Sequence, residues 1–208
     1  MMSLDGRLVG TDDYEFEDYY AALLNSIQTA FIDKGNSGQI TIGPANHDFK
    51  GEIGKSGSVL QLKSYAAYLS VHGEPPSEPD FSVIGHELNE INQGRLPLGK
   101  FKHLINHSDS NGFYIPVDFD DPFSFDVASS TGDGSWKCDI GSSNALLREL
   151  DELNQFLKVP GDVGQLNGTA VLDQQIAGDT FEEEKRVWGM LHWLARESVA
   201  RSLLLEFC

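Results

Sequence analysis

The stretch from Phe113 to Ile140 alternates apolar and polar residues in three arms that are separated by turn residues. A period of two is typical of strands with one buried and one exposed face. One face would collect the aromatic and aliphatic side chains, and the other would be mostly acidic. The stretch therefore predicts a three-stranded antiparallel meander. Pro116 has no N–H donor, which places the first strand at a sheet edge or a bulge.

Six other segments repeat apolar residues at the three-and-four spacing of amphipathic helices. They cover residues 12–33, 58–72, 80–93, 98–107, 142–157 and 180–203. Ser142 or Ser143 is the expected cap of the helix that follows the meander. Gln39 to Ile42 is a short strand candidate, and residues 159–179 predict a long loop or flap. We predict a helix-rich α+β fold in which five or six helices pack on one face of the meander.

Length and charge limit the class of protein. With 208 residues, the chain is long enough for one domain with its own core, spanning residues 1–208. Its formal net charge is −17, and its 15 basic residues form no patch. Binding to nucleic acid or to an anionic membrane surface is therefore disfavoured. A strongly acidic chain instead attracts basic partners.

The amino-terminal residues lack the positive start and apolar run of a signal peptide. No apolar run approaches the ~18 residues of a membrane span. These features predict a cytoplasmic protein. Cys138 lies in the alternating stretch and is expected to be a small buried apolar residue.

Templates for catalysis fail at required positions. Gly54-Lys55-Ser56 resembles the end of a phosphate-binding loop, but Phe49 stands where that loop needs glycine. The nucleophile pattern Gly-x-Ser-x-Gly is absent from the sequence. No cofactor is expected on this basis, and a non-enzymatic protein is favoured.

One pattern in the sequence leaves an enzymatic function as an alternative. His103 and His107 are four residues apart, so they would share a helix face, and Asp109 follows closely. This is the spacing of a two-histidine metal site. The alternative is thus a small metal-dependent enzyme centred on these three residues, with residues 159–179 as a lid.

The acidic side of the predicted meander supports a different hypothesis, that of a protein that binds a basic protein partner. Its carboxylates would face lysines and arginines of that partner, and an aromatic side chain of the same surface would act as an anchor. The predicted contact residues are Tyr114, Asp118, Asp120, Asp121, Asp126 and Asp139.

Part of the chain resembles a known group of proteins. The run His107-Ser108-Asp109-Ser110-Asn111-Gly112-Phe113-Tyr114-Ile115-Pro116-Val117-Asp118-Phe119 and the later run Ile140-Gly141-Ser142-Ser143 with Leu146-Leu147-Arg148-Glu149-Leu150 carry the resemblance. Both resemble a pattern in small, acidic, uncharacterised bacterial proteins, some of which look like immunity proteins paired with secreted toxins. The resemblance implies an immunity-type inhibitor that occludes a basic partner such as a toxin, and it supplies no catalytic residues. The oligomeric state stays open.

Overall fold

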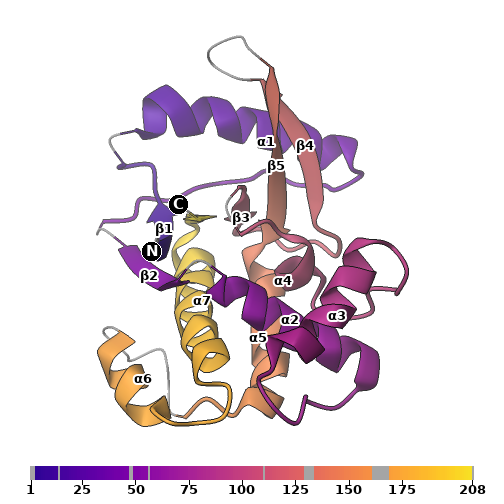
Figure 1. The fold of residues 1–208 in the computed structure, drawn as a ribbon. Helices are drawn as coiled ribbons and strands as arrows, with labels where there is room; N and C mark the ends of the chain where they lie inside the picture. The colour runs from indigo at the N-terminus through magenta and orange to yellow at the C-terminus, as the bar shows by residue number, and fades with distance from the viewer. Residues whose placement is uncertain are drawn as a thin grey trace.

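The computed structural model describes residues 3–13, 15–46, 49–55, 57–109, 111–128, 134–160 and 169–207. The chain forms a mixed sheet with helices on both sides (Figure 1). The strands are β1 (Ser3–Val9), β2 (Phe49–Lys55), β3 (Phe113–Ile115), β4 (Phe123–Ala128), β5 (Ser135–Ser142) and β6 (Leu204–Phe207). The helices are the π-helical turn η1 (Phe16–Tyr20), α1 (Ala21–Asp33), α2 (Ser58–His72), α3 (Phe81–Asn92), α4 (Lys102–Asn106), α5 (Ser143–Leu157), α6 (Thr169–Ile176) and α7 (Glu182–Arg201). The predicted α+β class is confirmed.

The strand order is β2-β1-β6-β3-β5-β4, and only the β3–β5 pair is parallel. The predicted antiparallel meander is therefore only half right. β4 and β5 form a hairpin in which Phe123 lies opposite Ile140. β3 instead pairs with β5 in parallel and with β6 on its other side. The edge position predicted for β3 was wrong, because Pro116 follows the strand and removes no hydrogen bond from it.

Three strands were missing from the prediction. β1 and β2 contain glycines and charged residues, which weaken a strand pattern. β6 was not predicted, because the last helix was expected to run to Leu203 and no element was assigned after it; Ser202 instead adopts a left-handed conformation that ends α7. The strand predicted from Gln39 to Ile42 does not form. There the backbone N–H of Ile40 donates to the side chain of Gln28 on α1 instead of to a strand.

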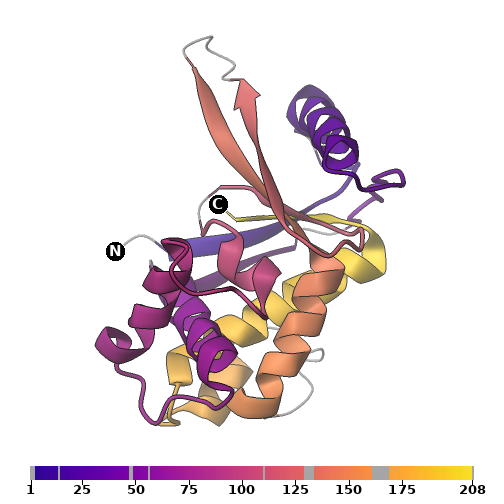
Figure 2. The same ribbon diagram turned by 90° about the vertical axis from the view of Figure 1, so that its right-hand side faces the viewer.

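Two hydrophobic cores lie on opposite faces of this sheet (Figure 2). The larger core joins α2, α4, α5 and α7 to one face. The smaller core joins Leu23, Ile27 and Phe31 of α1 to Phe113 and Phe123 on the other face. Neighbouring residues of β6 alternate between the two cores, as in a strand covered on both sides. The prediction that all helices pack on one face was therefore wrong, because β3 and β6 are interior strands.

Two local predictions have different outcomes. The Ser142 hydroxyl accepts a hydrogen bond from the N–H of Ala145 at 3.0 Å, which confirms the cap of α5. The loop predicted over residues 159–179 instead contains α6, which buries Leu172 and Ile176 against the larger core. Residues 161–168 of that range lie outside the described part. Among the described helices, none has the length and apolar character needed to cross a membrane.

Gly112 sets the approach of the chain to β3. Its φ of 114° lies in the left-handed region, and a Cβ atom there would collide with the backbone of Asp139 on β5. Only glycine allows this close approach. Gly112 thus fixes where β3 joins β5.

Candidate protein-binding surface

The predicted acidic contact residues lie on the β3–β4 connection and on the hairpin. Asp118, Asp120, Asp121 and Asp126 are exposed. Asp139 is half-buried, and its carboxylate accepts a hydrogen bond from the N–H of Ser108 at 3.1 Å. The structure therefore leaves four of the five predicted carboxylates open to solvent.

Basic residues offset the negative charge of this surface. Arg148 holds Asp118 with two hydrogen bonds of 2.9 and 2.7 Å, and Lys102 holds Asp121 at 2.5 Å. Two shallow hollows flank Asp120 and Asp121. Their basic lining residues are Lys34, Lys100, Lys102, Lys137 and Arg148. Because a third of the chain's 15 basic residues gather here, this surface is not dominated by negative charge.

Tyr114 cannot act as the predicted exposed anchor. Its side chain is buried, with 1% exposure, because β3 is covered on both faces. The ring stacks on His107 with centroids 4.0 Å apart, and the hydroxyl donates to the carbonyl of His103 at 2.9 Å. Tyr114 therefore belongs to the core.

The histidines of the metal hypothesis are also buried, and each makes hydrogen-bond contacts within the chain, although Nε2 of His107 has no partner among the described residues. The Nδ1 atom of His103 accepts from the N–H of Ser142 at 2.9 Å, and its Nε2 atom lies 3.3 Å from the carbonyl of Asp120. Burial lowers the pKa of His103, and it lowers the pKa of His107 to about 4. Asp109 is paired with Lys63. Within the described ranges, no three His, Cys, Asp or Glu side chains form a group that could hold a metal ion.

Glu149 is a half-buried carboxyl beside His103 that the sequence did not single out. From α5 it accepts hydrogen bonds from the N–H groups of His103 and Leu104 at 3.0 and 2.8 Å, and so satisfies free donors at the start of α4. Burial nevertheless raises its pKa to about 7, although these backbone donors act in the opposite direction. Ionised Glu149 thus lowers the stability of the folded chain.

The substitution Glu149→Gln should change the pH dependence of stability. Because the folded pKa of about 7 lies above the ordinary value of 4.5, the stabilising contribution is present below pH 4.5 and is lost as the pH rises through 7. Glutamine stays neutral, so the stability of the variant relative to the wild type should rise by up to about 3 kcal/mol as the pH is raised from 5 to 8. Denaturant unfolding at both pH values measures this difference. Glu152→Gln, in an exposed pair with Lys100, is the control, and equal pH dependence in both variants would contradict the assignment.

A second acidic surface lies at the other end of the sheet, on the side that α1 covers. Arg7 of β1 lies opposite Lys50 of β2 and Glu206 of β6, and Glu206 lies opposite Phe113 of β3. Residues directly opposite each other share a face, so the apolar surface beneath α1 continues into a charged one. We call this the amino-terminal acidic surface. It comprises Asp5, Asp13, Glu15, Glu52 and Glu206. Asp12 and Glu17 lie next to these residues in the chain, and the Asp12 carboxylate accepts hydrogen bonds from the N–H groups of Ala45 and Asn46.

Arg7 lies at the centre of this surface. Its guanidinium donates to Asp13 and, at 3.3 Å, to Glu15, and it lies 5.9 Å from the centre of the Tyr20 ring. The Tyr20 hydroxyl donates to Glu206 at 2.7 Å. These contacts link β1, the turn before η1, η1 itself and β6.

The amino-terminal acidic surface is poorly compensated. Among the described side chains, five carboxylates share it with two basic residues, Arg7 and Lys50, and the Lys50 ammonium lies 3.3 Å from Asp5. Asp5 and Glu52 lie directly opposite each other on β1 and β2. Like charges in that position destabilise a sheet. This surface therefore has a local cost of repulsion that a positively charged partner would relieve.

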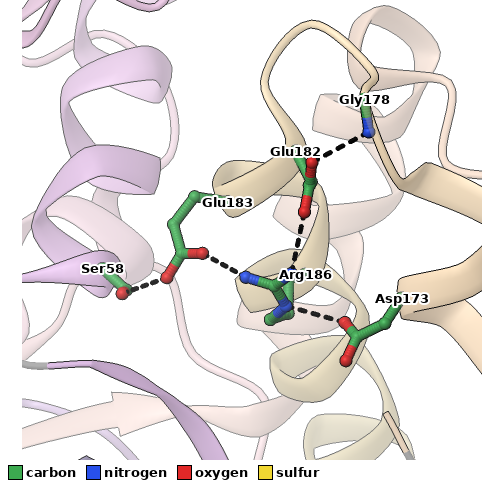
Figure 3. Close-up of polar contacts among 6 residues, drawn as sticks. All are labelled: Ser58, Asp173, Gly178, Glu182, Glu183 and Arg186. Carbon is green, nitrogen blue, oxygen red and sulfur yellow. Dashed lines mark hydrogen bonds and ion pairs between the residues drawn. The ribbon is translucent and has the colours of Figure 1, made fainter. Parts of the chain in front are cut away.

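A third acidic group, at the start of α7, is bonded within the chain (Figure 3). Arg186 binds Asp173 of α6 at 2.7 Å, Glu182 at 3.0 Å, and Glu183. Glu183 also accepts from the Ser58 hydroxyl of α2, while Glu182 accepts from the N–H of Gly178 at 2.9 Å. Acidic residues in the first turn of α7 also interact favourably with the positive end of the helix dipole. These carboxylates therefore join α2, α6 and α7 and serve the fold.

The sequence was also compared with known proteins. No curated protein and no solved structure matches it. A family model with the description "Putative DNA-mimic protein" matches residues 10–207, which is nearly the whole chain and includes most of the amino-terminal acidic surface. The chain therefore belongs to the family described as putative DNA-mimic protein.

Proposed function

We propose that the protein binds a DNA-binding protein and occludes its DNA-binding surface, with carboxylates taking the place of phosphates. The observation that supports this proposal is the amino-terminal acidic surface, where five carboxylates share a face with two basic residues among the described side chains. Membership of the family supports the same class of partner. The mechanism is non-enzymatic: capture by charge, followed by occlusion.

The chemistry of DNA binding explains why carboxylates would suffice. A DNA-binding surface presents lysines and arginines that neutralise phosphates, and this electrostatic contribution is independent of base sequence. Arginine makes bidentate contacts with carboxylates as it does with phosphates. Neighbouring strands hold side chains about 4.8 Å apart, so β1 and β2 would present Asp5 and Glu52 as a close pair of negative charges. A rigid sheet would keep this pair in place without a further cost of ordering.

The immunity-type hypothesis also has acidic residues of this chain attract a basic partner, which in that case is a toxin. It depends on the sequence resemblance and stays a prediction. A DNA-binding protein is the better supported partner because of the family to which the chain belongs.

Displacement by DNA tests the proposal. The wild-type chain is immobilised, a cell extract from its source is passed over it, and duplex DNA is then added at constant ionic strength. We expect the captured partner to be released and to bind that duplex by itself, because the two ligands would occupy one surface. Polyglutamate at equal charge is the control and should release less. A partner that binds the duplex while it stays on the chain would overturn the proposal.

A further inference from the structure

The outer edge of β4 is open. β4 is the last strand of the sheet, and its hairpin with β5 projects from the rest of the molecule (Figure 1). Among the described residues, backbone hydrogen bonds link β4 to β5 and to no other segment. An edge of this kind is a template for pairing with another strand.

The opposite edge of the same sheet is protected, and the contrast is informative. β2 carries charges at Lys50, Glu52 and Lys55 and has glycines at 51 and 54. Its pairing with β1 is interrupted by a register shift between Leu4 and Asp5. β4 has a continuous register, no proline and no lysine, and its single charged residue is Asp126. Charges and bulges are the usual protection of edge strands, so β4 lacks what β2 has.

The residues of β4 are self-complementary in one antiparallel register. If a twofold axis passes through Phe125, Asp126 of one copy lies opposite Ser124 of the other, and Phe123 lies opposite Val127. Phe123, Phe125 and Val127 lie on the α1 side of the sheet, where Phe125 and Val127 are only half-buried. Pairing would extend this apolar row across the junction. A shift that places Asp126 opposite Asp126 is disfavoured by like-charge repulsion.

Charge also favours this part of the molecule for self-association. Two chains with a net charge of −17 repel each other wherever their acidic surfaces meet. The hairpin is the region where Lys34, Lys102 and Lys137 offset the carboxylates. The amino-terminal acidic surfaces lie at the far end of each sheet, and charges separated by more than about 8 Å are largely screened at physiological salt.

We propose that two copies of this chain pair antiparallel through β4 and form one continuous sheet. The two amino-terminal acidic surfaces then lie at the outer ends of the joint sheet, and both stay accessible. This inference does not depend on the proposed function, although a twofold pair of acidic surfaces would suit a dimeric DNA-binding protein.

Sedimentation analysis of the purified chain tests the pairing. The wild type should show a monomer–dimer equilibrium. Phe125→Lys and Phe125→Glu, measured separately, should each weaken dimerisation at least tenfold, because like charges would meet at the axis. An equimolar mixture of the two variants should restore the dimer, since lysine would then lie opposite glutamate; a misfolded variant would give no such rescue.

Three results would overturn the proposal. They are a wild-type chain that stays monomeric across the concentration range, variants that dimerise as tightly as the wild type, and a mixture that remains monomeric. Because the chain is measured alone, each result is independent of the displacement experiment with DNA.

Discussion

Replacing Glu17 and Glu52 with lysine should lower the association rate with the DNA-displaceable partner by about 10- to 1,000-fold at low salt. Both carboxylates are exposed, Glu52 on the amino-terminal acidic surface and Glu17 two residues after Glu15 of that surface, so lysine fits at either position without burial of charge. Glu52→Lys also removes the like-charge pair with Asp5. The fold should therefore be kept while the field that steers a basic partner is reversed.

The control for this variant must separate the effect of where the charges are changed from the effect of the change in net charge. Glu74→Lys with Glu78→Lys changes the net charge equally, from −17 to −13, on an exposed loop between α2 and α3. Stopped-flow association at several salt concentrations compares the two. We expect a lower rate and a weaker salt dependence only for the first variant. Equal losses in both would mean that total charge, and not this surface, attracts the partner.

A third variant tests the surface that was predicted from the sequence. Asp120→Lys with Asp126→Lys makes the same change of charge on the hairpin side. The five basic residues near Asp120 and Asp121 already offset the field there. This variant should therefore resemble the loop control more than the variant at Glu17 and Glu52.

The helices could be read from the sequence because their signals are local. The apolar stripe of α5 and its serine cap lie within one segment, and both appear in the structure as predicted. The β4–β5 hairpin is local as well, and its alternation is correct. A periodic pattern within one segment determines the element but not its neighbours in space.

The order of the strands could not be read in this way. β3 pairs with β5 and β6, and β6 lies at the far end of the chain. β6 reads Leu-Leu-Glu-Phe, and a run of four residues with apolar side chains on both faces fits equally well with the end of an amphipathic helix. Without β1, β2 and β6, the meander seemed to be the whole sheet, and β3 seemed to be its edge.

The same omission hid the better candidate site. Asp5, Glu52 and Glu206 come from β1, β2 and β6, and only the strand register brings them to one face. In the sequence, five acidic residues between positions 12 and 18 look like a solvated helix start. The hairpin carboxylates were contiguous and therefore visible, but the basic residues that offset them come from other segments. The sequence therefore pointed to the surface whose negative charge is offset by basic residues, because its carboxylates lie close together along the chain.

Asp109→Asn should be one of the most destabilising single changes in the chain, with a loss of about 3–5 kcal/mol in the free energy of unfolding. Asp109 pairs with Lys63 of α2, whose side chain is only 7% exposed. The Lys63 ammonium also donates to the backbone carbonyl of His107. This carbonyl is uncharged and cannot replace the carboxylate as a counter-ion. Asparagine would leave the ammonium buried without a counter-ion.

The reverse substitution should cost less, and this asymmetry is the sharper test. Lys63→Met leaves Asp109, whose side chain is 32% exposed, so water can hydrate the carboxylate, and we expect a loss of about 1–3 kcal/mol. In the double variant neither charge remains, so its loss should be smaller than the sum of the single losses. Denaturant unfolding of the four proteins at one pH measures the cycle. A smaller loss for Asp109→Asn than for Lys63→Met would contradict this explanation. It would show that an unpaired ammonium at position 63 costs less stability than an unpaired carboxylate at position 109.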